Sequence, residues 1–419
     1  MLVTPRERSV LESIAGGGEG MVARAVGWCA VNSGSRNLEG LSATLGLLTE
    51  AWGAAFPQAV VSHEAMAPLV EIGADGRETT HEPPPALLVT MRPQAPVQVV
   101  LTGHYDTVFP AGSPFQAVTA RGDGALNGPG IADMKGGISV MLAALEAFEG
   151  FAGCEAVGWR VLLSPDEEIG SLGSGPVLAR IGRLGHVGMT YEPALADGTL
   201  AGARKGSGNF HVKVTGRSAH AGRAFDEGRN AVTAAARIAG ALDGLNGRRE
   251  GVTVNVARID GGSALNVVPD LAVVRFNVRF PDDAGRRWLE GEVEAACGCG
   301  RGDGLGVKVF GGVTRAAKPF NAAQASLFGA VREVGAALGQ EIAWKPSGGV
   351  CEGNNLFAVG LPNVDTLGVR GGDIHSEAEF AWPDSFVERA QLSALMLMKM
   401  ASGEVDAVGL RRMMDEAPQ

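Results

Sequence analysis

The stretch VQVVLTGHYDTV, residues 97–108, decides the fold, because a β-type apolar run ends there at a histidine and an aspartate. A second apolar run, WRVLL, follows at residues 159–163, and an apolar stretch of helical length lies between them at residues 136–148. Apolar strands that alternate with helices predict a sheet covered by helices. We therefore expect the first half of the chain to be an α/β unit.

The alternation stops after Arg204 and resumes from Phe320. The intervening segment has a βαββαβ order, which is typical of a small α+β sandwich of four strands and two helices. Its strands are expected at residues 209–215, 252–259, 271–280 and 306–310, with an alanine-rich helix over 230–245 and a charged helix before the last strand. The sequence thus predicts residues 206–317 as a domain inserted into a larger one, made of residues 1–205 and 318–419 and closed by a helix over 385–401.

Length, charge and cysteine content limit the function classes. The 419 residues predict two or three domains, and 36 basic against 46 acidic residues give a net charge of −10 without a Lys/Arg-rich run. This charge balance excludes the basic surface of a nucleic-acid or anionic-membrane binder and favours a small-molecule partner. The five cysteines are too scattered for a disulfide framework, and no apolar run suits a secretory signal or a membrane span. We expect a cytoplasmic protein.

His104 and Asp106 stand two residues apart where the first apolar strand ends. In an extended chain, both side chains point the same way at the carboxyl end of the strand, where ligands collect in open α/β sheets. One interpretation is a metal-binding histidine oriented by Asp106. The alternative is a surface histidine beside an aspartate that caps a turn, and the two interpretations are equally supported by this segment alone.

Asp133 lies in GPGIADMKGG, residues 128–137, just before an apolar helix. A phosphate-binding loop is excluded, because Asp133 occupies the third glycine position of G-x-G-x-x-G and no G-K-[ST] follows. A carboxylate would also repel a phosphate at the start of a helix. Helix capping by Asp133 remains open beside metal binding.

Three more segments place carboxylates or a histidine in glycine-framed loops after strands. In SPDEEIGS, alternation puts Glu167 and Glu168 on opposite sides, so that one can bind a metal while the other transfers a proton. Glu192 ends the segment HVGMTYEP, and His375 lies in GVRGGDIHSEAEF after the expected strand NVDTL. Each is an ordinary turn residue in the alternative interpretation. Together the candidate ligands form a nitrogen and oxygen set that suits paired zinc, cobalt or manganese ions: His104, Asp133, Glu168, Glu192 and His375.

These motifs resemble the dinuclear zinc amidohydrolases and metallopeptidases, which include aminoacylase, acetylornithine deacetylase, succinyl-diaminopimelate desuccinylase and, most similar, glutamate carboxypeptidase. The resemblance rests on HYDTV, GPGIADMKGG, SPDEEIGS, YEP, RSAHAG and GGSALNVVPD, in order along most of the chain. It implies a zinc-exopeptidase-like catalytic domain with a mixed central sheet, and an inserted ferredoxin-like lid through which two chains form a homodimer. It also implies two zinc ions, with His104 and Glu192 on one, Glu168 and His375 on the other, and Asp133 bridging.

The resemblance further implies the catalytic and substrate-binding residues. Glu167 is the general base, Asp106 supports His104, and His220 in RSAHAG stabilises the oxyanion across the dimer interface. Asn266 and Arg279 are expected to bind a substrate carboxylate, and Gly349 is a further candidate for the substrate site. The alternative for His220 is a loop histidine, that for Asn266 is a turn residue before Pro269, and that for Arg279 is a strand-surface charge.

Two departures from the family pattern bear on the substrate. The chain reads SGGVCEGNN, with Val350 and Glu352, where the family has Gly-Gly-Thr and an aspartate. The segment TRAAKPFN lacks the second arginine of the glutamate-releasing enzyme and offers Lys318, which cannot reproduce a bidentate grip on a carboxylate.

The leading hypothesis is a hydrolase that cleaves the amide of an N-acyl amino acid or peptide and releases an amino acid with a free carboxylate. One alternative is hydrolysis of another C–N bond, in an arylamine, carbamoyl or amidine substrate, on the same metal site. A second alternative is a metal-stabilised binding protein without catalysis, which the presence of both Glu167 and Asp106 disfavours.

Overall fold

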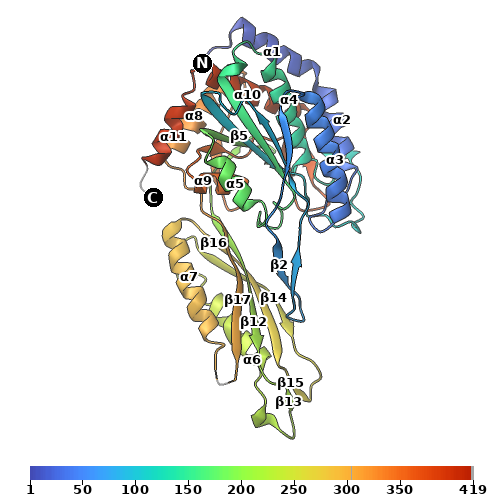
Figure 1. The fold of residues 1–419 in the computed structure, drawn as a ribbon, viewed down its shortest axis with the longest axis vertical. Coiled ribbons are helices and arrows are strands. Elements are labelled where there is room, and N and C mark those ends of the chain that lie inside the picture. The colour runs from blue at the N-terminus through green and yellow to red at the C-terminus, as the bar shows by residue number, and fades with distance from the viewer. Residues whose placement is uncertain (303, 417–419) are drawn as a thin grey trace.

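The computed structural model describes residues 1–302 and 304–416, which form two lobes (Figure 1). The large lobe contains both ends of the described chain and a six-stranded mixed sheet. Three strand pairs of this sheet are parallel and two are antiparallel. The order of its strands is β1 (Val60–Glu64), β4 (Ala86–Met91), β8 (Val157–Ser164), β5 (Val97–His104), β9 (Val187–Thr190) and β19 (Asn363–Val364).

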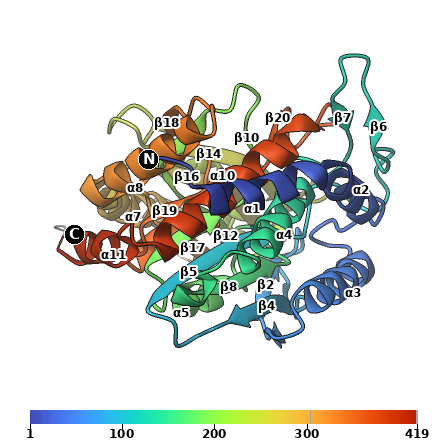
Figure 2. The ribbon, with the colours of Figure 1, turned by 90° about the horizontal axis from the view of Figure 1, so that it is seen from above.

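Helices cover both faces of this sheet, because its strands are apolar on both sides. Val99 and Leu101 of β5 belong to the main core, whereas Val100 belongs to a smaller core on the opposite face. Figure 2 shows α4 and α10 on one side of β5 and β8 and α5 on the other. The helices of the main core are α1 (Pro5–Gly16), α2 (Gly18–Cys29), α3 (Leu38–Ala55), α4 (Lys135–Glu149), α8 (Ala322–Ala337), α10 (Asp384–Ala401) and α11 (Ala407–Asp415), and those of the smaller core are α5 (Gly175–Gly182) and α9 (Glu352–Ala358).

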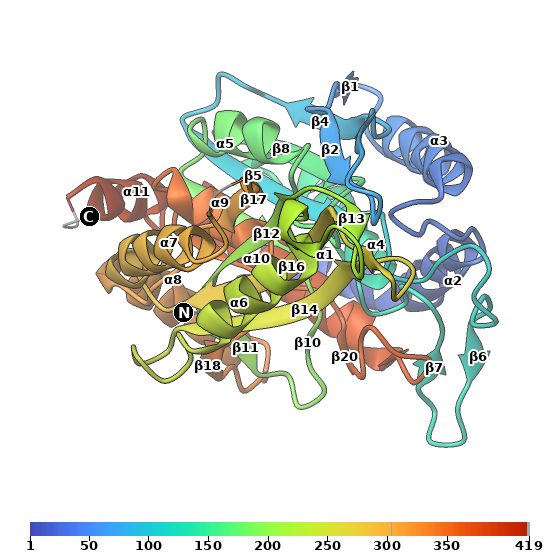
Figure 3. The same ribbon diagram turned by 90° about the horizontal axis from the view of Figure 1, so that it is seen from below.

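The small lobe confirms the predicted βαββαβ order. Its four antiparallel strands are arranged β14 (Thr253–Gly261), β16 (Leu271–Phe280), β12 (Gly206–Thr215) and β17 (Gly306–Arg315). Figure 3 shows α6 (Ala231–Asp243) and α7 (Asp283–Gly298) on one face of this sheet. The apolar residues of these six elements form a core separate from that of the large lobe. A two-stranded extension, β13 (Ala219–His220) with β15 (Val267–Val268), forms the far tip of the lobe (Figure 1).

Short pairings complete the fold. A hairpin of β2 (Leu69–Ile72) and β3 (Glu78–His81) extends from the large lobe to the small one, where Glu78 forms an ion pair with Lys308 at 2.9 Å. Strand β11 (Leu200–Arg204) leads into β12 and pairs with β18 (Trp344–Ser347). A five-stranded sheet supports the loops around Asp133 and His375, and consists of β10 (Ala194–Leu195), β20 (Arg370–Gly372), β21 (Phe380–Ala381), β7 (Leu126–Asn127) and β6 (Thr119–Ala120).

The structure differs from the sequence expectations in two places. The helix expected to close the chain is α10, but α11 follows it after a turn and packs against α8 and β9. The expected strand NVDTL is ordered as a strand only at Asn363 and Val364.

All five cysteines are free thiols. Among the described residues, no helix is both long and apolar enough to cross a membrane.

Candidate metal centre

The candidate site lies where β5, β8 and β9 end at the same edge of the sheet. Parallel pairing sets His104 opposite Ser164 and Thr102 opposite Thr190, so the loops that follow these strands meet. Those loops carry Glu167 and Glu192. A cleft of about 420 Å³ opens there, lined by large-lobe carboxylates and by side chains of the small lobe.

Asp133 stands between two histidines. Its Oδ1 lies 3.1 Å from Nε2 of His104, and its Oδ2 lies 3.3 Å from Nε2 of His375. Glu192 lies on the His104 side, with Oε1 at 3.8 Å from Nε2, and Glu168 lies on the His375 side, with Oε2 at 3.2 Å from Nε2. The single carboxylate of Asp133 therefore faces two separate histidine and glutamate pairs, an arrangement that can bridge two cations.

The burial of these carboxylates favours a bound cation. Burial and the negative charge of Asp133 raise the pKa of Glu168 to about 8 and that of Glu192 to about 7. Glu192 Oε1 is buried, and no described residue forms a hydrogen bond with it. Hydrogen bonds to Asp133 and Glu168 raise the pKa of His375 to about 11. Carboxylates this close repel one another unless protons or a cation intervene, and the nitrogen and oxygen donors suit a divalent metal.

Ligand atoms also cluster in two groups that could each hold an ion. His104, Asp133 and Glu168 form one group and His104, Glu167 and Glu192 the other, with the ligand atoms of each group within 4.8 Å of one another. Glu167 thus lies at the metal centre itself.

Asp106 connects three parts of the centre. Its carboxylate accepts hydrogen bonds from the backbone N–H groups of Glu167 at 3.1 Å and Glu168 at 3.2 Å, and from the hydroxyl of Ser35 at 2.7 Å. Its Oδ1 lies 3.3 Å from Nδ1 of His104. Asp106 is fully buried, so a change there affects the histidine and both glutamates together.

Two residues at this site were not identified from the sequence. Glu379 is buried and accepts hydrogen bonds through Oε1 from the backbone N–H groups of Ala132 at 3.0 Å and Asp133 at 3.1 Å. Burial and the charge of Asp133 raise the pKa of Glu379 to about 7. Its place four residues after His375 was the available signal. Arg315, at the end of β17, forms an ion pair with Glu167 at 2.7 Å, and no local sequence pattern indicated it.

The expected substrate residues divide into two sets. Arg279 and Gly349 line the cleft together with the metal centre. Arg279 donates from Nε to Asn277 Oδ1 at 3.0 Å, and its buried Nη1 has no hydrogen-bond partner among the residues that the structure describes. His220 and Asn266, by contrast, are exposed at the far tip of the small lobe, where Ala221 N–H donates to the Asn266 carbonyl at 2.9 Å (Figure 1). Within one chain, these two residues do not reach the cleft.

Lys318 cannot contact a substrate in this structure. It is fully buried, and its Nζ lies 2.8 Å from Oδ2 of Asp365, which also accepts a hydrogen bond from Arg204 Nε at 2.8 Å.

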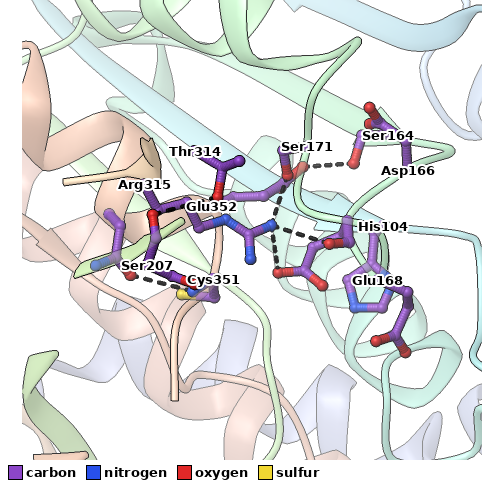
Figure 4. Close-up of polar contacts among 12 residues, drawn as sticks. His104, Ser164, Asp166, Glu168, Ser171, Ser207, Thr314, Arg315, Cys351 and Glu352 are labelled. Atoms are coloured by element: carbon purple, nitrogen blue, oxygen red, sulfur yellow. Dashed lines mark hydrogen bonds and ion pairs between the residues drawn. The ribbon is translucent and has the colours of Figure 1, made fainter. Parts of the chain in front are cut away.

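The altered segment SGGVCEGNN lies partly in the cleft and partly behind it. Gly349 and Val350 line the cleft, whereas Cys351 and Glu352 are buried. Glu352 is hydrogen-bonded to Ser164 behind the site (Figure 4).

The fold and the cluster of carboxylates and histidines at the cleft are those of a metal-dependent hydrolase. Residues 100–399 match the model of peptidase family M20/M25/M40, and the chain belongs to this family. The predicted family and the mixed sheet with a second α+β lobe are thereby confirmed.

Relatives and solved structures agree with this assignment. The chain is 28% identical to carboxypeptidase G2 of Pseudomonas sp. (strain RS-16) over 322 residues, which cover 73% of this chain and 74% of the relative. It is 28% identical to succinyl-diaminopimelate desuccinylase 2 of Shewanella loihica, over 64% of this chain and 78% of the relative. The structure of human carnosine dipeptidase 1 superposes with a TM-score of 0.70 at 16% identity, over 94% of this chain and 100% of that one, and shows the same fold.

Proposed function

We propose that this protein hydrolyses the amide bond of an N-acyl amino acid or a peptide and releases an amino acid with a free carboxylate. The observation that carries the proposal is the position of Asp133, whose two oxygens face His104 and His375, with Glu167 beside them. The relatives include a carboxypeptidase and a desuccinylase, names that describe removal of an amino acid or an acyl group.

In this proposal the site holds two zinc ions, with cobalt or manganese as possible replacements. His104 and Glu192 would hold one ion, Glu168 and His375 the other, and Asp133 both. A divalent cation bound there lowers the pKa of a coordinated water and polarises the substrate carbonyl.

Glu167 is the proposed general base and acid. Its carboxylate takes a proton from the attacking water and later delivers a proton to the nitrogen of the leaving amine. Asp106 holds Glu167 and His104 in a fixed position relative to each other. It accepts a hydrogen bond from the Glu167 N–H and contacts the His104 imidazole. Orientation of this kind accounts for a large part of the rate in enzymes with a fixed base.

Arg279 is the proposed partner of the substrate carboxylate. Its buried and unpaired Nη1 faces no competing carboxylate at hydrogen-bond distance, so a substrate anion would satisfy it. Gly349, which also lines the cleft, is proposed to leave room for the substrate backbone.

We further propose that two chains form a homodimer through residues 206–317, with residues 1–205 and 318–419 as the catalytic domain. The exposed tip that bears His220 and Asn266 would then enter the cleft of the other subunit. There His220 would donate to the oxyanion and Asn266 to the substrate carboxylate.

The test is amino acid release from a panel of N-acyl amino acids and dipeptides by zinc-, cobalt- and manganese-loaded protein. The variant Glu167→Gln removes the base, and Glu155→Gln, an exposed glutamate before β8, is the matched control. We expect release by wild type and the control and loss of roughly 10²-fold or more in Glu167→Gln. No release with any metal, or full turnover by Glu167→Gln, would contradict the proposal.

A second candidate is hydrolysis of another C–N bond on the same site. The burial of Lys318 favours it, because Lys318, the residue that the segment offers in place of the second arginine of the glutamate-releasing enzyme, does not line the cleft. Release of ammonia, and not of an amino acid, from carbamoyl or amidine substrates would identify this activity.

A further inference from the structure

Arg315 makes three contacts with the loop that carries Glu167. Its Nη2 lies 2.7 Å from Oε1 of Glu167, donates to the backbone carbonyl of Glu167 at 3.0 Å and donates to the hydroxyl of Ser171 at 2.7 Å. Figure 4 shows the Arg315 side chain directed at Ser171 and this loop. One guanidinium group therefore binds both the side chain and the main chain of Glu167.

The contact is buried and ionic. The side chain of Arg315 is 4% exposed and that of Glu167 is 8% exposed. Solvent screens a buried ion pair much less than a surface pair. The same nitrogen of Arg315 also donates the two hydrogen bonds to the Glu167 carbonyl and the Ser171 hydroxyl. The pair therefore restrains the Glu167 carboxylate far more than a surface ion pair would.

The two partners come from different lobes. Arg315 is the last residue of β17, where it pairs with Ser207 of β12 in the small-lobe sheet. Glu167 lies in the loop after β8 of the large-lobe sheet. The position of the small lobe therefore determines where the guanidinium group meets Glu167.

The loop is shaped to receive this contact. Ser171 is buried and has a φ of 52°, and its N–H donates to the Asp166 carbonyl at 2.8 Å. The Gly170 N–H donates to the same Glu167 carbonyl that Arg315 binds, at 2.8 Å. This tight turn brings the Ser171 hydroxyl and the Glu167 carboxylate to one side, where Arg315 reaches both.

We propose that Arg315 is a positioning residue: it holds the Glu167 carboxylate through Oε1, leaves the other oxygen to accept the proton, and links this orientation to the position of the small lobe. The proposal rests on the proposed role of Glu167 as general base. All three contacts are made by Nη2. Lysine at this position would keep the charge, but its side chain is one bond shorter and carries a compact ammonium group, so it should not reach all three acceptors in the same geometry.

The test compares Arg315→Gln, Arg315→Lys and Ser171→Ala with Arg160→Gln as the control. Arg160 lies on β8, is 8% exposed and donates to Gln98 at 2.6 Å away from the cleft. We expect kcat of Arg315→Gln to fall roughly 10²-fold while KM and metal content stay unchanged. Arg315→Lys and Ser171→Ala should show smaller losses, and Arg160→Gln should melt at a lower temperature with unchanged kcat.

Two further measurements separate positioning from simple structural support. Guanidinium ion should restore part of the kcat of Arg315→Ala, whereas ammonium ion should not. Hydrogen exchange of the segment 166–171 should be faster in Arg315→Gln than in wild type, and this readout does not depend on turnover.

Several results would overturn the proposal. Wild-type kcat in Arg315→Gln, a raised KM with unchanged kcat, or loss of metal would each assign Arg315 another role. If Arg315→Gln does not fold, a wild-type kcat in both Arg315→Lys and Ser171→Ala would also overturn the positioning role of Arg315. An inactive Glu167→Gln beside a fully active Arg315→Gln overturns the positioning role alone, whereas an active Glu167→Gln removes the proposed function.

Discussion

The Asp106 carboxylate accepts a hydrogen bond from the backbone N–H of Glu167 at 3.1 Å, while its Oδ1 lies 3.3 Å from the His104 imidazole. The buried Asp106 side chain thus holds both His104, a candidate metal ligand at the end of β5, and Glu167, the candidate base in the loop after β8. Residues that orient a ligand in this way are as important to a metal site as the ligands themselves.

Replacement of Asp106 by asparagine should therefore weaken the site without removing any ligand. The amide keeps one acceptor oxygen and loses the other, so either the Glu167 or the Glu168 N–H loses its partner. We expect metal affinity or kcat to fall by roughly 10–100-fold. Metal titration and steady-state kinetics would measure this, with Asp123→Asn on the exposed β6–β7 turn as control. Unchanged affinity and kcat would show that Asp106 does not support the centre.

Glu379 offers a matched pair of variants. Both N–H groups that it binds reach the same oxygen, so Glu379→Gln keeps an acceptor in place whereas Glu379→Ala leaves two buried donors without one. Each such donor costs about 1–3 kcal/mol of stability. Urea unfolding and metal titration should show Glu379→Ala strongly impaired and Glu379→Gln close to wild type. Equal behaviour of the two variants would contradict this account of the Asp133 loop.

Thiol reactivity should separate the buried cysteines from the exposed one. Burial raises the pKa of Cys29 to about 12 and holds that of Cys351 well above its ordinary value, so both thiols stay protonated below these values. Only the thiolate reacts, and therefore an increase from about pH 7 to about pH 9 should leave Cys351 unmodified in the folded protein. Mass spectrometry after alkylation should find Cys299 modified first, and Cys299→Ser should abolish the fast phase. Rapid labelling of Cys351 would show that the segment behind the cleft opens.

Subunit complementation tests the proposed role of the tip residue. If His220 acts in the other subunit, His220→Ala and Glu167→Gln should each be inactive alone. Each mixed dimer should contain one site in which both residues are wild type. Random exchange of subunits between equal amounts of the two variants makes about half of the dimers mixed, so about a quarter of wild-type activity should return. Refolding the variants together and assaying the mixture would measure this. No recovery, with dimers verified by sedimentation, would contradict a role across the interface.

The sequence predicted the metal-centre candidates because they depend on local register. His104 ends β5, Glu167 and Glu192 come shortly after β8 and β9, and parallel strands end at the same edge of a sheet. Asp133 and His375 are framed by glycines that mark loops, so their neighbourhood was also predictable. The βαββαβ order of the small lobe followed from periodicity alone.

Contacts between distant segments were not predictable in this way. Arg315 meets Glu167 only because two lobes pack together, and Glu379 meets the Asp133 loop across 246 positions of the chain. A strand-end arginine has no pattern that distinguishes it from a surface charge, and the position of Glu379 four residues after His375 does not show which loop it contacts. The burial of Lys318 beside Asp365 was not predictable for the same reason, since it depends on tertiary packing.

The most direct test of the account is the number of metal ions bound per chain by the reconstituted protein, measured by elemental analysis together with His104→Ala and His375→Ala. The position of Asp133 between the two histidines predicts two ions per chain in wild type, with reduced occupancy in each variant. One ion in wild type, or no ion after reconstitution with zinc, cobalt and manganese, would contradict the two-metal centre on which the proposed function rests.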